Sequence, residues 1–123
     1  MLREWVEAKS GSWLPRAPGV SAQLAEVGRV TWPVVTQIDA ELGGLSLYLG
    51  TRELWVGLDS ALEMPNFRRT LEGRPHVMVG ALGTTGWYVD EGGAMLEVSS
   101  DGRVVGRCAS VREALERLSL QPA

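Results

Sequence analysis

Short apolar runs separated by turn residues follow one another from Val77 to Leu118, and they predict three or four antiparallel strands. The strongest turn signal is Asp101-Gly102, between the runs AMLEV and RVVGR. A type I′ turn requires positive φ at both central positions, which favours this residue pair. Glu91-Gly92-Gly93 marks the preceding turn. We therefore expect a meander of β-hairpins in this part of the protein.

An amphipathic helix is predicted directly after these strands. Ser110 and Glu113 have the spacing of a capping box, in which two side chains satisfy backbone donors at a helix start. Apolar residues then recur at the spacing of one helix face, at Val111, Ala114, Leu115 and Leu118. A helix of this kind buries its apolar face, so we expect it to pack back on the sheet.

The chain before the meander predicts short helices. Helices over Leu2–Ala8 and after Ser21 would make residues 1–30 a helical segment. A third helix begins at its predicted N-cap, Thr31, and ends at Gly43-Gly44. Its apolar face consists of Val34, Val35, Ile38 and Leu42.

Two apolar segments and one irregular segment connect this helix to the meander. Leu45–Leu49 is either a strand or a buried connection, and Glu53–Asp59 favours a strand because its apolar residues alternate. Ala61–Pro75 breaks the pattern and predicts a loop that contains at most a helical turn. The expected fold class is α+β, with short N-terminal helices, a central antiparallel β-sheet and a C-terminal amphipathic helix packed on the sheet. We expect a single domain over residues 1–123, with residues 31–118 as its core.

Length and charge narrow the classes of function. A chain of 123 residues is long enough for one hydrophobic core. Its net charge of −3 does not favour nucleic-acid binding, which depends on clustered Lys and Arg. The first residues carry charges where a signal peptide needs an apolar stretch, and no apolar run reaches the roughly 18 residues of a membrane helix. We expect a cytoplasmic protein that binds neither nucleic acid nor membrane.

Patterns for catalysis and metal binding are weak. His76 and Cys108 are the only histidine and cysteine, so we expect no disulfide, no metal site and no cofactor. One cysteine and one histidine are enough in number for a nucleophilic Cys-His pair. However, Cys108 ends an apolar strand, where cysteine usually acts as a small hydrophobe. Acidic residues at the predicted strand ends are more typical of solvated rim charges than of a catalytic pair; they are Asp59, Asp90, Glu91 and Glu97. We expect no catalytic residues.

Tryptophan is unusually frequent, with five residues against one phenylalanine. The large area that Trp buries favours core positions, to which we assign four of the five. Trp55 lies on the face of its predicted strand opposite Leu54 and Val56. Both a second buried layer and a partner interface, where Trp is enriched, are open for it. The candidate partner contacts are Trp55, Asp59, Trp87, Asp90 and Glu91.

Three motifs follow one another in an order that points to a known family. They are the helix-ending Gly43-Gly44-Leu45, the pair Tyr88-Val89-Asp90 and Leu96-Glu97-Val98 with Asp101-Gly102, and the helix entry Ala109-Ser110-Val111. Over residues 31–118 the chain resembles the SUKH superfamily, which comprises bacterial immunity proteins related to yeast cell-wall assembly regulators. The resemblance implies an α+β fold and a protein that acts by binding.

The function implied by the resemblance is neutralisation of a cognate toxin, typically a nuclease or deaminase delivered between bacterial cells, by blocking its active site. Such toxins are usually basic, so acidic residues such as Asp59, Asp90 and Glu91 would steer their association. An exposed sheet edge would also permit a homodimer. Two other functions stay open: a regulatory module that binds an endogenous protein, and a small enzyme that uses Cys108 or clustered carboxylates.

Overall fold

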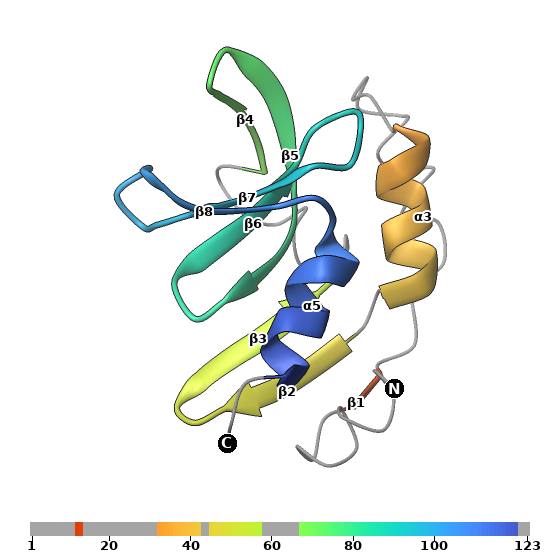
Figure 1. Cartoon of the computed structure of the whole chain (residues 1–123), viewed down its shortest axis with the longest axis vertical. Coiled ribbons are helices and arrows are strands. Elements are labelled where there is room, and N and C mark those ends of the chain that lie inside the picture. The colour runs from red at the N-terminus through yellow and green to blue at the C-terminus, as the bar shows by residue number, and fades with distance from the viewer. Residues whose placement is uncertain (1–11, 14–31, 43–44, 58–66, 121–123) are drawn as a thin grey trace.

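The computed structural model describes residues 12–13, 32–42, 45–57 and 67–120 (Figure 1). Antiparallel strands are the main regular structure of the described part, and two helices accompany them. In chain order the elements are β1 (Ser12–Trp13), α3 (Pro33–Leu42), β2 (Leu45–Leu49), β3 (Arg52–Val56), β4 (Arg68–Leu71), β5 (Arg74–Leu82), β6 (Thr85–Val89), β7 (Met95–Val98), β8 (Val104–Cys108) and α5 (Val111–Leu120). The expected antiparallel sheet and C-terminal helix are therefore present. The helices predicted within residues 1–30 lie outside the described residues.

All described strands belong to one antiparallel sheet with the order β1-β2-β3-β5-β6-β7-β8. β4 also pairs with β5, so β3 and β4 lie along the same edge of this long strand, each beside a different half of it. Val79 is an extra residue where the register of β5 against β6 shifts, at the point where one edge partner gives way to the other. Backbone hydrogen bonds continue the edge on both sides of it: the Met78 amide donates to the Phe67 carbonyl (2.8 Å), and the Gly57 amide donates to the Val79 carbonyl (2.9 Å). The bulge thus coincides with the point at which β5 changes its partner on the other edge.

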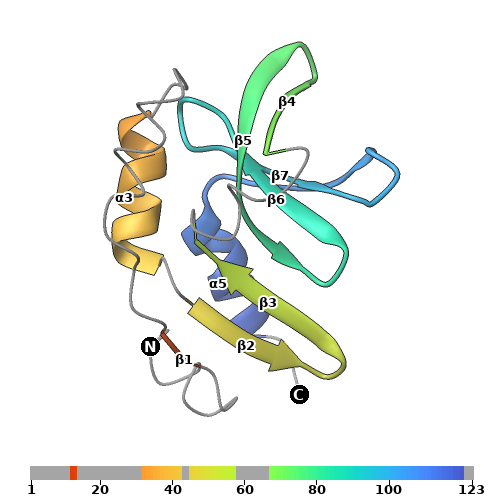
Figure 2. The ribbon, with the colours of Figure 1, turned by 180° about the vertical axis from the view of Figure 1, so that it is seen from behind.

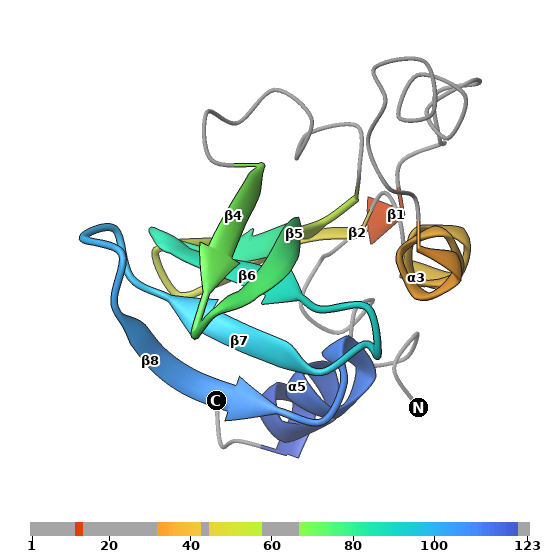
Figure 3. The same cartoon turned by 90° about the horizontal axis from the view of Figure 1, so that it is seen from above.

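Helix α5 covers one side of the sheet (Figure 3). Figure 3 shows α5 on one side and β4 curled over the other. Side chains directly opposite one another in an antiparallel pair share a side, and the register then places Leu54, Trp87 and Met95 on the α5 side. The core here is completed from the predicted apolar face of α5, on which Val111, Ala114 and Leu115 are buried and Leu118 is half-buried. This face is confirmed.

The other side of the sheet has a smaller buried cluster under β4. Its members are Phe67, Leu71, Met78, Tyr88, Leu96 and Val98, all at most 7% exposed. The Arg69 guanidinium lies over the Tyr88 ring at 5.4 Å from its centroid, where a cation is attracted to the aromatic face. Arg107 on β8 forms an ion pair with Glu72 in the β4–β5 turn. These contacts hold β4 and the β4–β5 turn against β6 and β8, across one side of a strongly coiled sheet.

The type I′ turn is not where the sequence predicted it. The turn with positive φ at both central positions is Glu72-Gly73 (φ 54° and 75°), between β4 and β5. At Asp101-Gly102 only the glycine has positive φ (88°), and the Ser99 amide donates to the Arg103 carbonyl across a three-residue loop. This geometry is a type I turn followed by one left-handed residue, which needs a single glycine. The predicted hairpin is confirmed, and its turn type was wrong.

Three further predictions concern the segment between α3 and the meander. Leu45–Leu49 is a strand, which resolves the open alternative. The strand predicted over Glu53–Asp59 is β3, Arg52–Val56, and Gly57 already lies beyond its end. Residues 58–59 of the prediction lie outside the described residues. The loop predicted over Ala61–Pro75 was wrong from Arg68 onward, because β4 and the start of β5 occupy that part.

The predicted capping box starts α5. The Glu113 amide donates to Ser110 Oγ at 3.1 Å. The Glu113 carboxylate accepts from the amide of Ala109 at 2.8 Å, one residue earlier than the sequence rule states. We expect Ser110→Ala to lower the free energy of unfolding by about 1 kcal/mol, because the amide of Glu113 loses its partner. Chemical denaturation measures this loss, with Ser100→Ala in the exposed β7–β8 loop as the control; equal effects of the two would contradict the cap.

The Glu72–Arg107 pair gives stability that depends on pH. The hydrogen bond from Arg107 lowers the pKa of Glu72 below its usual 4.5. A carboxylate with a lowered pKa in the folded state stabilises the fold above its unfolded pKa and loses this effect as pH falls through the folded value. Wild type should therefore exceed Glu72→Gln in stability at about pH 6, with the difference vanishing towards about pH 3. Urea titrations at both pH values measure it, and a difference that does not change with pH would contradict the assignment. The effect is small, because both side chains are well exposed to water.

Candidate functional site

The predicted contact residues lie in different environments. Trp55 is partly buried and packs against the core, and Glu91 is exposed in the β6–β7 turn. Asp59 lies outside the described residues. Trp87 is 1% exposed, so its indole belongs to the core and does not offer a surface to a partner protein. We therefore remove Trp87 from the set of surface contacts.

Asp90 holds a turn together. Its Oδ1 accepts hydrogen bonds from the amides of Gly92 (2.9 Å) and Ala94 (3.2 Å), and its Oδ2 lies 3.5 Å from Arg74 Nη1. The side chain is 10% exposed. A carboxylate bonded locally in this way fixes the β6–β7 loop, as Asp commonly does in turns. Little of the Asp90 side chain is therefore accessible to a partner protein.

Trp55 and the Asp90 turn do not form one site. Trp55 pairs with Ala81 on β5, which pairs with Gly86 on β6. Asp90 follows β6, four residues beyond Gly86, which corresponds to about 13 Å along the strand direction. The acidic turn therefore lies near the opposite end of the β5–β6 pair from Trp55.

A different group of side chains gathers around Trp55. Ser46 pairs with Trp55, and Tyr48 pairs with Glu53, so these four share one side of the β2–β3 hairpin. We call Ser46, Tyr48, Glu53 and Trp55 the hairpin surface. Tyr48 is 60% exposed, the largest value among the big apolar side chains of the described residues. The signal for Tyr48 was present in the sequence, because the alternation in LSLYL places Ser46 and Tyr48 opposite the leucines.

The hairpin surface faces away from α5. Arg52 alternates with Glu53 along β3, and Arg52 lines a pocket beneath α5. Figure 2, seen from behind, shows the β2–β3 hairpin in front of α5, so the side towards the viewer is the one that α5 leaves free. In Figures 1 and 2 the hairpin lies at the far end of the molecule from the β4–β5 turn. It is a projecting element with an aromatic and acidic side.

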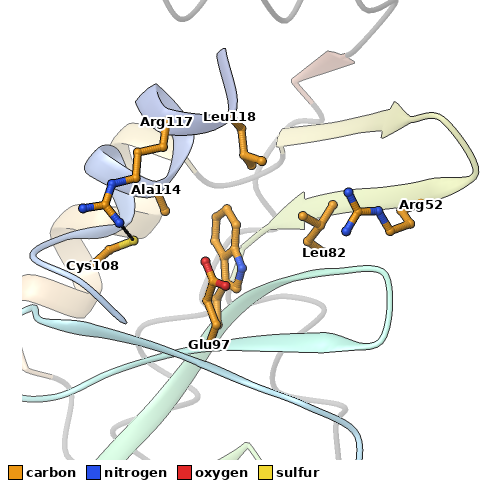
Figure 4. Close-up of a pocket in the computed structure, with 8 residues that line it drawn as sticks. Arg52, Leu82, Glu97, Cys108, Ala114, Arg117 and Leu118 are labelled. Atoms are coloured by element: carbon orange, nitrogen blue, oxygen red, sulfur yellow. Dashed lines mark hydrogen bonds between the residues drawn. The ribbon is translucent and has the colours of Figure 1, made fainter. Parts of the chain in front are cut away.

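The pocket beneath α5 has a volume of about 240 Å³. Figure 4 shows Ala114, Arg117 and Leu118 reaching into it from α5, and Arg52 and Leu82 facing them from the strands. Trp87, Glu97 and Cys108 complete its lining. No local motif in the sequence indicates this pocket, because it arises only when the helix packs on the sheet.

The residues that suggested nucleophilic catalysis lie on opposite sides of the sheet. Cys108 pairs with Met95, and Met95 pairs with Val89, which places Cys108 on the α5 side. His76 is buried on the other side, and its Nδ1 lies 2.9 Å from the Arg74 carbonyl. Burial raises the pKa of the Cys108 thiol, which disfavours the reactive thiolate. The Cys-His pair does not form.

Comparisons of the chain with protein-family models, with curated proteins and with solved structures give no significant match. Within the described ranges no group of three or more His, Cys, Asp or Glu side chains is arranged to hold a metal ion. Neither α3 nor α5, the described helices, has the length and apolar character needed to cross a membrane.

Proposed function

We propose that this protein is an immunity protein of the SUKH type, which binds a cognate bacterial toxin and neutralises it by blocking its active site. The hairpin surface is the observation that carries the proposal. Tyr and Trp are enriched among the residues that dominate protein–protein binding energy, because each supplies a large rigid area with a polar end. Tyr48 and Trp55 present this chemistry on a projecting hairpin.

Charge is compatible with a basic partner at the hairpin surface, as it is at the Asp90 turn, where Glu91 is exposed and has no ion pair with a described residue. Most described acidic side chains are already paired with arginine, at Glu72, Asp90, Asp101, Glu113 and Glu116. Glu53 is exposed and has no ion pair among the described residues. An unpaired carboxylate beside Tyr48 suits a basic nuclease or deaminase, because complementary charge speeds association and fixes orientation.

The β8 edge of the sheet gives less support to a homodimer. β8 is the last strand in the order, and Val105 is an extra residue where its pairing with β7 shifts from Gly106 to Val104. A bulge disrupts the regular row of backbone groups that edge-to-edge pairing needs. We therefore place the partner on the hairpin surface and not on the β8 edge.

Co-expression with a toxin encoded beside the gene tests the proposed function. We expect the toxin alone to stop growth of the host cell and the pair to restore it, with a one-to-one complex in size-exclusion chromatography. A neighbouring toxin that stays active and unbound would overturn the proposal. In that event the regulatory module that binds an endogenous protein becomes the better hypothesis.

A further inference from the structure

We infer that the pocket beneath α5 is a binding site for a linear aminocarboxylate, that is, for a ligand with an ammonium group at one end of a carbon chain and a carboxylate at the other. Binding there goes beyond the proposed function and does not depend on a toxin. Two side chains of opposite charge line the pocket without an ion pair among the described residues, and an apolar side chain lies on a strand between them.

Glu97 supplies the negative charge. Its register partners, Trp87 on β6 and Gly106 on β8, place it on the α5 side of the sheet. Figure 4 shows its carboxylate pointing from β7 into the space beneath α5. The side chain is half-buried and forms no ion pair with a described residue. A carboxylate that has lost part of its water without gaining a cation is unfavourable, and the ammonium group of a ligand would neutralise it.

Arg52 supplies the positive charge. It lines the pocket from β3 and forms no ion pair with a described residue. Figure 4 shows its guanidinium directed towards Leu82 on the neighbouring strand β5. Arg117, the other arginine of the lining, is already engaged, because it pairs with Glu113 at 2.6 Å and lies 3.5 Å from Cys108 Sγ. Of the two arginines, Arg52 is therefore the one available to a carboxylate.

The two charges do not neutralise each other. Arg52 is on β3 and Glu97 is on β7, with β5 and β6 between them in the sheet. Three strand spacings correspond to about 14 Å between the backbones of β3 and β7. The two side chains shorten this gap but form no ion pair with each other. A ligand that joins them therefore needs its own two charges at separate ends of its chain.

Simpler ligands leave at least one charge unpaired. An anion would neutralise Arg52 and leave Glu97 without a cation, and a cation would do the reverse. A neutral ligand would exclude water from both groups without replacing it, which is unfavourable for each. A zwitterion with separated charges pairs with both, and each of these contacts is a charge-assisted hydrogen bond.

The pocket also has the size and walls for such a chain. About 240 Å³ exceeds the roughly 30 Å³ of one water molecule several-fold. Leu82 and Leu118 provide apolar side chains on which methylene groups would pack (Figure 4). Leu82 belongs to β5, which lies between the strands of Arg52 and Glu97. The ligand would be either a free amino acid with a terminal amino group or the C-terminal lysine of another protein, which carries the same two charges.

Four compounds with a six-carbon chain test the inference: 6-aminohexanoate, hexanoate, hexylammonium and norleucine. Norleucine is the isomer of 6-aminohexanoate that has both charges at one end. The readout is the shift of the backbone amide resonances of Leu82 and Ala114 in ¹⁵N-labelled protein. We expect 6-aminohexanoate to shift them saturably with a Kd on the order of 1 mM, as suits a ligand of this size. The other three should bind at least about 10-fold more weakly.

The same titration with Nα-acetyl-lysine distinguishes the two sources of the ligand. This compound copies a C-terminal lysine, and its amide, which lacks the carboxylate, is the control. Tighter binding of Nα-acetyl-lysine than of 6-aminohexanoate would favour a protein C-terminus, and weaker binding would favour a free amino acid. Either result supports the inference if removal of the carboxylate weakens binding.

Removal of each charge should change which compound is preferred. In Glu97→Gln the advantage of 6-aminohexanoate over hexanoate should disappear, because the ammonium group loses its partner. In Arg52→Gln the advantage over hexylammonium should disappear for the corresponding reason. Glu116→Gln and Arg68→Gln, which lie outside the pocket lining, are the controls and should keep both advantages.

Three results would overturn the inference. The first is binding of norleucine, hexanoate or hexylammonium to the wild-type protein as tightly as 6-aminohexanoate, a comparison that needs no variant to fold. The second is a preference for 6-aminohexanoate that survives both Glu97→Gln and Arg52→Gln. The third is the absence of a saturable shift with every compound, which would mean that water satisfies both charges.

Discussion

Gly80→Ala is expected to lower the free energy of unfolding by about 3 kcal/mol, because it inserts a methyl group against backbone that has no room to move. A Cβ at this position would lie 2.5 Å from the carbonyl oxygen of Trp55 and 3.2 Å from Cα of Val56. Both atoms belong to β3, which is hydrogen-bonded to β5 at this point. The clash therefore forces the two strands apart beside the Val79 bulge, where β5 changes its edge partner.

Gly106→Ala is the matched control for this prediction. Gly106 also lies within a strand, without the positive φ that would itself favour glycine. Its new Cβ would meet the end of the Glu97 side chain at 2.6 Å, and a flexible carboxylate rotates away. We expect a loss of about 1 kcal/mol or less, as for most substitutions outside rigid core packing. Denaturant titration of the two variants measures the contrast. A loss at Gly80 no greater than that at Gly106 would show that β3 shifts without cost and contradict the tight approach of β3 and β5.

The elements that sequence predicts correctly are those whose signals are local. The period of apolar residues and the capping box define α5, and glycine-marked turns define the hairpins from β5 to β8. β4 has no such signal, because RRTL alternates weakly and only Leu71 is buried in it. Its pairing with β5 depends on the Glu72-Gly73 turn, in which a glutamate adopts positive φ. Propensity rules disfavour that conformation, and tertiary contacts such as the Glu72–Arg107 pair override them.

The candidate site shows the same division between local and long-range signals. Alternation along a strand correctly placed Trp55 opposite Leu54 and Val56, and the same rule identifies Tyr48 once Leu45–Leu49 is known to be a strand. Sequence alone does not show which role Asp90 has, because a carboxylate beside a turn suits both turn formation and partner binding. The structure shows that its side chain accepts two backbone hydrogen bonds within the turn. The pocket depends on side chains from β3, β5, β6, β7, β8 and α5. No spacing within the sequence encodes an assembly of that kind.

Tyr48→Ala is expected to weaken binding of the cognate toxin about 100-fold while leaving the fold intact. A central aromatic contact commonly contributes about 2–4 kcal/mol to an interface, and 100-fold corresponds to about 2.7 kcal/mol. The side chain is 60% exposed, so little packing is lost in the free protein. Trp55 is a poorer first test, because it also packs against the core and its removal would mix binding with stability.

Val105→Ala is the control for Tyr48→Ala. Val105 on β8 is 57% exposed and, among the described residues, is the other large apolar side chain that is exposed to solvent. Isothermal titration calorimetry of each variant with the toxin gives the change in Kd, and thermal melts verify that both remain folded. We expect Val105→Ala to bind as wild type does. If Val105→Ala loses affinity and Tyr48→Ala keeps it, the toxin binds at the β8 edge and the hairpin surface is not its contact. Tyr48 on β2 lies near one end of the strand order and Val105 on β8 lies at the other end, so a loss of affinity confined to one variant shows which of these two surfaces meets the partner.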